Sequence, residues 1–173
     1  MYAIRSVDPE QWQTYRAIRL RALLDSPDAF GSTYEIEVAR PDDQWLSRIS
    51  GAATSGKDRV VFSVMGENVC GLAWCKVSAL EPGVADLFQM WVDPGFRGLG
   101  IGAALLQDAV DYARGAGVDI LRLGVTVAES PAMRLYSSFG FKPVGAVESL
   151  REGSAISAQA MQLHLSAAIR RRR

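Results

Sequence analysis

Three glycines at alternate positions, Gly98, Gly100 and Gly102, form the stretch of the sequence whose chemistry is easiest to interpret. They precede and enter an apolar pattern of helical spacing that begins at Ile101. Helix propensity does not explain them, because each glycine costs a helix about 1 kcal/mol relative to alanine. Glycines allow another group to approach the backbone, and the free N–H groups of a helix start lie at the positive end of its dipole. The combination suits an anion such as a pyrophosphate.

Three kinds of phosphate-binding loop can be compared with this stretch. A Walker A loop ends in Gly-Lys-Ser/Thr, whereas these glycines lead into alanines, so we exclude it. The dinucleotide fingerprint G-x-G-x-x-G/A is matched by Gly98, Gly100 and Ala103, but it should open a doubly wound sheet and be followed by a strand that ends in an acidic residue. The third pattern, Arg/Gln-x-x-Gly-x-Gly/Ala, is matched by Arg97, Gly100 and Gly102.

A second motif lies further along the chain, where Ser130 and Pro131 are expected to open a helix. Residues 132–141 read A-x-x-L-Y-x-x-x-G-F, with Tyr136 as the tyrosine. Together with the glycine loop, which follows a strand ending in Trp-Val-Asp-Pro, this segment resembles the GCN5-related N-acetyltransferase (GNAT) superfamily. The resemblance covers nearly the whole chain.

The elements that must position these motifs follow from hydrophobic periodicity and turn residues. The sequence predicts helices from Asp8-Pro9 to about Leu24, from Pro41-Asp42 to about residue 50, over 101–115 and over 131–139, with a mixed loop over 25–40 and a polar connection over 51–58. The expected strands are Tyr2–Ser6, Arg59–Met65, Val69–Val77, Leu87–Val92, Asp119–Val127, Phe141–Val147 and Gln159–Leu165. This is an α/β chain with a mixed, mostly antiparallel central sheet flanked by helices, in the element order of the acetyltransferase fold.

The length of 173 residues favours one domain, which the resemblance implies is a single N-acetyltransferase domain over 1–173; we expect it to end in a frayed basic tail, Arg170–Arg173. The formal net charge is zero, and no signal peptide or spanning segment is evident, so we expect a cytoplasmic protein, monomer or homodimer, without nucleic-acid or membrane partners. Cys70 and Cys75 lie an odd number of residues apart in one strand, which predicts opposite faces and no pairing. Neither they nor His164 have the spacing of a metal site, and no metal is expected.

The resemblance implies a set of acetyl-CoA contacts. Backbone groups of the strand segment Met90, Trp91 and Val92 would pair with the pantetheine arm like an added strand. Main-chain amides of the loop would hold the phosphates; its residues are Arg97, Gly98, Leu99, Gly100, Ile101, Gly102 and Ala103. Glu129 stands where many members carry an asparagine that contacts the cofactor, and it is either a cofactor contact or a solvated or capping residue.

The resemblance also implies that Tyr136 is the candidate catalytic residue, as the general acid that protonates the leaving thiolate; the alternative is a packed core aromatic. The candidate acceptor-site residues are Phe30, Tyr34, Glu35, Glu37 and Gln89. The two glutamates either line the pocket or face water, and the general base is not identified.

The activity implied is transfer of the acetyl group of acetyl-CoA to a primary amine of a small molecule or peptide, by direct attack in a ternary complex. A non-catalytic acyl-CoA-binding or sensing domain and a dinucleotide-binding module remain alternatives.

Overall fold

The computed structural model describes residues 1–165, so the predicted tail Arg170–Arg173 lies outside the described residues. A seven-stranded sheet with the order β1-β2-β3-β4-β5-β7-β6 forms its centre. Neighbouring strands are antiparallel except for the parallel pair β4 and β5. The strands are β1 (Ala3–Ser6), β2 (Asp58–Met65), β3 (Asn68–Val77), β4 (Val84–Val92), β5 (Ile120–Thr126), β6 (Lys142–Ser149) and β7 (Ser157–His164).

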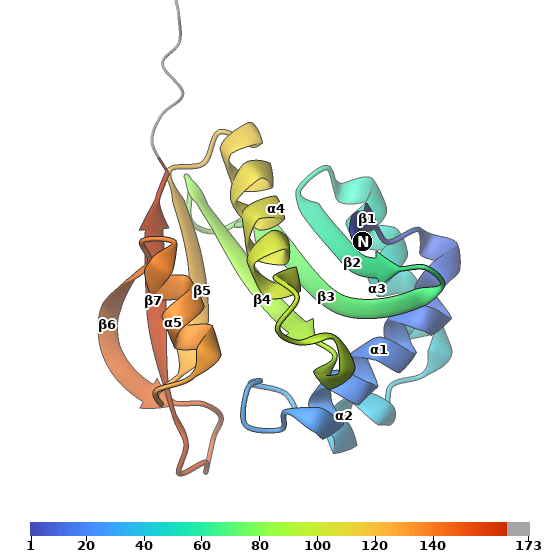
Figure 1. Ribbon diagram of the computed structural model, residues 1–173, viewed down its shortest axis with the longest axis horizontal. Coiled ribbons are helices and arrows are strands. Elements are labelled where there is room, and N and C mark those ends of the chain that lie inside the picture. Colours follow the sequence, from blue (N-terminus) through green and yellow to red (C-terminus); the bar gives the residue numbers. More distant parts are fainter. Residues whose placement is uncertain (166–173) are drawn as a thin grey trace, which may run out of the picture.

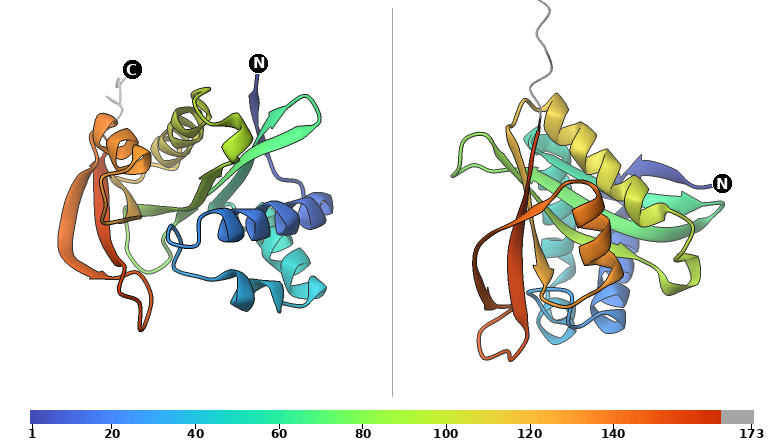
Figure 2. Two further views of the ribbon diagram at one scale, coloured as in Figure 1. Left: turned by 60° about the horizontal axis from the view of Figure 1, so that its bottom comes forward. Right: turned by 60° about the vertical axis from the view of Figure 1, so that its left-hand side comes forward.

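Helices cover both faces of this sheet (Figure 1). α4 and α5 lie on one face, while α1, α2 and α3 lie on the other (Figure 2). The helices are α1 (Trp12–Asp25), α2 (Tyr34–Val38), α3 (Asp42–Ser55), α4 (Ile101–Gly115) and α5 (Pro131–Ser138), with 3-10 turns η1 (Pro9–Gln11) and η2 (Pro94–Phe96). The mixed, mostly antiparallel α/β fold expected from the sequence is therefore confirmed. None of the helices within 1–165 is both long enough and apolar enough to cross a bilayer.

Helix starts agree with the sequence, whereas two connections do not. Asp8 caps the first turn as expected, accepting a hydrogen bond from the Glu10 amide at 2.9 Å, and Ser130 caps α5. The expected loop over 25–40 contains α2, whose start is capped by Thr33. The polar connection predicted over 51–58 is wrong, because α3 continues to Ser55 and ends at a glycine in the left-handed conformation.

Two hydrophobic cores lie on the two faces of the sheet. The first, called the α4 core, packs α4 and α5 against one face of the sheet. The second, called the α1 core, packs α1 and α3 against the other face. Cys70 and Cys75 both belong to the α4 core, so the prediction that they point to opposite faces is wrong. The register between β2 and β3 shifts next to Val64, which places one extra β3 residue opposite β2 and reverses the alternation of side chains before Cys75. Both thiols are buried and free.

Candidate active site

The central feature of the site is the separation of β4 from β5. These strands pair only from Val84 to Asp86 on β4, opposite Ile120 to Arg122 on β5, and diverge beyond that point (Figure 1). The amide of Asp93, just after β4, donates to the Cys70 carbonyl of β3 at 2.8 Å. Since alternate residues of a strand direct their backbone groups to opposite edges, those of Met90 and Val92 point toward the gap. This edge of β4 can accept an added strand-like ligand.

A bulge in β4 decides which side chains reach the gap. The register between β3 and β4 shifts opposite Ala73, and Gln89 adopts a φ of 57°, which only glycine adopts without strain. Leu87, before the bulge, packs in the α4 core. After the bulge, Met90 packs against the α4 core and Trp91 packs in the α1 core. The Gln89 side chain therefore points toward α1, where its Oε1 accepts a hydrogen bond from the Tyr15 hydroxyl at 2.5 Å.

The glycine loop connects β4 to α4 as the sequence predicted. Gly98 and Gly100 have φ values of 80° and 82°, in the left-handed region that favours glycine. Gly100 is the N-terminal cap of α4, and the first intrahelical hydrogen bond runs from the Ala104 amide to its carbonyl at 3.1 Å. The amides of the three preceding residues, 101–103, therefore have no acceptor within the helix and are available to an anion.

Two ion pairs attach this loop to α1. The Arg97 guanidinium contacts the Asp25 carboxylate at 2.6 Å and donates to the Val92 carbonyl at 3.0 Å. Arg21 pairs with Asp93, whose side chain also accepts from the backbone of η2. Burial acts to raise the pKa of Asp25, but hydrogen bonds from its neighbours outweigh that effect and hold the pKa below its usual range. The Arg97 side chain is thus occupied in fixing the loop.

Tyr136 lies on α5 at the other side of the gap, and only 8% of its surface is exposed. Its ring packs against Phe141, with centroids 6.0 Å apart. Burial raises the pKa of Tyr136 to about 12, so the hydroxyl stays protonated at neutral pH. The side chain lines two adjoining hollows in the gap, one next to Met90 and Ser130 and the other next to Gln89.

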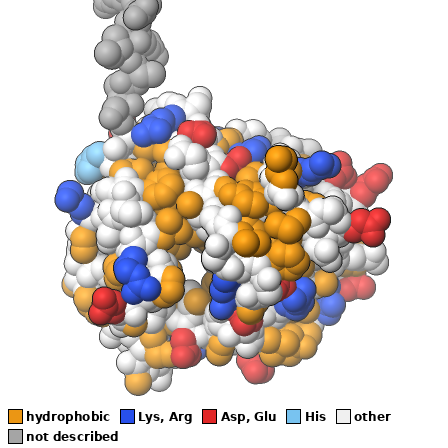
Figure 3. Space-filling model, in the orientation of Figure 1, with side chains coloured by type: hydrophobic (Ala, Val, Ile, Leu, Met, Phe, Trp, Pro, Cys, Tyr) orange, Lys and Arg blue, Asp and Glu red, His pale blue; other side chains and the backbone are white. Residues whose placement is uncertain are grey.

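The hollow beside Gln89 is the candidate acceptor cavity. Its volume of about 470 Å³ falls in the range of about 300–1,000 Å³ that is usual for small-molecule sites. The gap divides the molecule into two halves, one with β1 to β4 and the other with β5 to β7, and the space-filling view shows the surface hollowed between them (Figure 3). Residues of both halves line the acceptor cavity. Besides Phe30, Gln89, Met90 and Tyr136, they are Arg19, Ala29, Gly31, Arg48, Leu87, Phe88, Leu123, Gly124, Thr126, Leu150 and Ala158.

Several residues singled out in the sequence lie elsewhere. Glu129 and Glu35 are exposed and line none of these hollows, and Tyr34 packs against the α1 core. Glu37 was expected to line the pocket or to face water; it does neither, because it is 2% exposed and lies 2.7 Å from the Arg19 guanidinium. Arg19 was not recognised in the sequence, because it stands between Arg16 and Arg21 in a predicted helix and its partner lies on another element.

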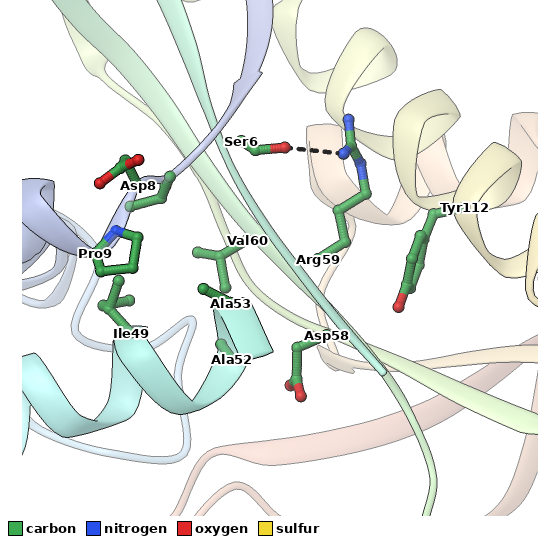
Figure 4. Close-up of a pocket in the computed structure, with 11 residues that line it drawn as sticks. Ser6, Asp8, Pro9, Ile49, Ala52, Ala53, Asp58, Arg59, Val60 and Tyr112 are labelled. Carbon is green, nitrogen blue, oxygen red and sulfur yellow. Dashed lines mark hydrogen bonds between the residues drawn. The ribbon is translucent and has the colours of Figure 1, made fainter. Parts of the chain in front are cut away.

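A separate hollow lies away from the gap, between β1, β2, α3 and α4 (Figure 4). Its Arg59 donates to Asp108 through two nitrogens, both at 2.7 Å, and to Ser6 at 3.0 Å. The Arg59 guanidinium is therefore engaged within the protein, and we do not assign this hollow a function. Within residues 1–165, no group of three or more His, Cys, Asp or Glu side chains is arranged to hold a metal ion.

Comparison with known proteins defines the class of protein. Residues 9–141 match the Acetyltransferase (GNAT) family, and this range includes the glycine loop, Tyr136, and α4 and β5 between them. The chain therefore belongs to this family.

Individual relatives are more distant. A mycothiol acetyltransferase of Thermobispora bispora is 30% identical over 138 residues, which are 78% of this chain and 43% of that protein. A streptothricin acetyltransferase of Streptomyces lavendulae is 33% identical over 117 residues, 66% of this chain and 61% of that protein. The chain thus spans less than two thirds of the length of each. The fold matches that of YncA from Salmonella typhimurium, solved with its cofactor acetyl-CoA, with a TM-score of 0.78, 22% identity and coverage of 95% and 94% of the two chains.

Proposed function

We propose that this chain is an acetyl-CoA-dependent N-acetyltransferase that acetylates an amine of a small molecule or peptide by direct attack in a ternary complex. The observation that carries the proposal is the gap between β4 and β5. The unpaired edge of β4 lies on one side of it and Tyr136 on the other, and the glycine loop follows directly after β4. Family membership and the acetyl-CoA bound to a protein of the same fold support it.

Acetyl-CoA would lie along the edge of β4. Its pyrophosphate would accept hydrogen bonds from the amides at the start of α4, at the positive end of the helix dipole. Its pantetheine arm would pair with the backbone of Met90 and Val92, since these groups point to the gap. The thioester would then reach the hollow lined by Met90 and Tyr136.

The chemical step needs a polarised carbonyl and a stabilised leaving group. A backbone N–H at the end of β4 would donate to the thioester oxygen and stabilise the charge that develops on it. As the carbon–sulfur bond breaks, the Tyr136 hydroxyl would donate a hydrogen bond to the thiolate. A tyrosine whose pKa is about 12 is fully protonated for this role at pH 7.

No carboxylate of the described residues lines the acceptor cavity, and the amide of Gln89, which β4 places there, does not act as a base. The acceptor would therefore enter as the neutral amine, or would lose its proton to water held by polar groups such as Gln89. Tyr15 does not supply a base, because burial raises its pKa to about 12 and its hydroxyl donates to Gln89. Glu35 and Glu37 of α2 take no part in the proposed mechanism.

The test is release of free thiol from acetyl-CoA in the presence of a panel of amines, combined with calorimetry of acetyl-CoA, CoA and NAD. We expect micromolar binding of both CoA species, no binding of NAD, and thiol release that depends on an amine. Binding of acetyl-CoA without any turnover would favour the non-catalytic acyl-CoA domain. Binding of NAD in place of CoA would favour the dinucleotide module and contradict the proposal.

A further inference from the structure

The charged side chains that line the acceptor cavity are all positive. Its lining contains two arginines, Arg19 from α1 and Arg48 from α3, and no aspartate or glutamate. The carboxylates of the adjoining hollows either pair with an arginine or are exposed: Asp25 and Asp86 pair with arginines, whereas Asp28 and Glu148 are exposed. A ligand in this cavity therefore meets positive charge on the side formed by α1 and α3.

Arg19 is a buried cation whose donors are not all used. It is 4% exposed, and its Nη2 lies 2.7 Å from the Glu37 carboxylate, while its Nε and Nη1 have no hydrogen-bond partner among the described residues. Glu37 is also shared with Arg40, whose Nη1 lies 3.4 Å away. One carboxylate thus faces two guanidinium groups. Buried donors without partners are costly, and each one in a native protein calls for an explanation.

The surroundings of Arg19 strengthen its field within the cavity. Its guanidinium carbon lies 4.7 Å from the centroid of the Phe30 ring, and both side chains line the cavity. Water is largely excluded from this contact, so the positive potential is screened less than that of a surface arginine.

Arg48 supplies the accessible cation. It is half-buried, lies over the Trp74 ring with its guanidinium carbon 5.9 Å from the centroid, and forms no ion pair with a described carboxylate. A planar guanidinium held over an aromatic ring is well suited to bind a carboxylate or phosphate group.

We infer that the acceptor carries an anionic group, a carboxylate or a phosphate, that lies toward Arg19 and Arg48 while its amine lies toward Tyr136. The inference rests on the proposed function, because it names the acceptor class of the same site. Tyr136 belongs to α5, whereas both arginines belong to helices on the opposite face of the sheet (Figure 2). The cavity reaches both sets of residues, so one small molecule with a positive and a negative end can span it. A polycationic acceptor would instead place a second ammonium group beside the arginines, where like charges repel.

The experiment compares paired acceptors that carry or lack this charge, with each rate expressed per concentration of neutral amine. Thiol release is measured for a set of free amino acids, for the corresponding amino acid amides, for an O-phosphorylated amine and its alcohol, and for the polyamine spermidine. We expect kcat/KM for the acidic member of the preferred pair to exceed that of its neutral partner by roughly tenfold or more, as for a hydrogen bond to a charged group.

Variants connect the preference to the arginines. Arg48→Gln should reduce the ratio of kcat/KM values between acidic and neutral acceptors by roughly tenfold, and Arg48→Glu should reverse it. Arg114→Gln, which changes an exposed arginine at the end of α4, is the matched control and should keep the ratio. Turnover of neutral amines or spermidine at rates equal to those of the acidic partners would overturn the inference and leave the acetyltransferase proposal intact. Absence of turnover with every amine would refute the acetyltransferase proposal itself.

Discussion

Replacement of Tyr136 by phenylalanine separates its proposed catalytic role from its packing. The ring lies in the α4 core and contacts Phe141, and both interactions remain in the variant. The structure gives the Tyr136 hydroxyl no hydrogen-bond partner among the described residues, so removing it breaks no such bond. The free energy of unfolding should therefore change by less than about 1 kcal/mol.

The size of the catalytic effect follows from two pKa values. The pKa of Tyr136 is about 12, whereas that of an alkyl thiol is about 8.5, so complete proton transfer to the thiolate is uphill by about 5 kcal/mol. The hydroxyl should therefore act mainly through a hydrogen bond to the developing thiolate. Such a bond to a charged group contributes about 1.5–3 kcal/mol. The acetyl-transfer rate of Tyr136→Phe should then fall by roughly 10- to 150-fold.

The rate must be measured on the chemical step. Single-turnover acetyl transfer, with enzyme in excess over acetyl-CoA and a saturating amine, avoids the contribution of product release. The dissociation constant of acetyl-CoA should stay within about twofold of the original value, since the lost interaction is formed with the leaving thiolate. Tyr112→Phe, a change on α4 outside the gap, serves as the control. A single-turnover rate for Tyr136→Phe that matches this control would reassign the residue to packing.

Three further predictions concern the loop and the pH dependence. Gly100→Val should abolish acetyl-CoA binding in calorimetry, whereas Gly117→Val, at a left-handed glycine after α4, should cost similar stability and keep binding. Asp25→Asn should lower stability at pH 7 and weaken acetyl-CoA binding severalfold. Because folding depresses the pKa of Asp25, the difference in stability between the original protein and this variant should disappear as the pH falls below about 4. A difference that stays constant with pH would contradict this. Finally, kcat/KM should rise with pH to a plateau set by the pKa of the amine used, without a decline below about pH 10, because Tyr136 stays protonated; a plateau that does not move between amines would instead indicate a base on the protein.

The sequence was sufficient for the parts of the site that depend on local patterns. Alternating glycines before an apolar helix predict a loop with unusual backbone angles at the start of that helix. Gly98 and Gly100 have the left-handed geometry that glycine permits. Caps at Asp8 and Ser130 were also readable, because the residues that satisfy a helix start lie within a few positions of it.

The remaining features depend on contacts between distant segments. A bulge adds one residue to a strand without a sequence signature here, since Gln89 is not a residue that favours a positive φ. The extra residue of the bulge turns the Gln89 side chain toward Tyr15 on α1. The burial of Glu37 likewise follows from Arg19 on another helix. A glutamate is ordinarily exposed, so its residue type alone predicts the wrong environment.

The loop after α1 explains how the sheet can open without separating the two halves of the protein. Beyond Asp86 the β4–β5 ladder is absent, and residues 26–31 supply hydrogen bonds that bridge the two halves at this end of the sheet. Thr126 of β5 donates to the Asp28 carbonyl at 2.6 Å, and Arg151 donates to the carbonyls of Pro27 and Phe30 at 2.6 Å and 3.0 Å. These hydrogen bonds place Phe30 in the wall of the acceptor cavity. Because they lie at the rim rather than along the strands, they connect the halves and leave the edge of β4 open for a thioester to meet its acceptor.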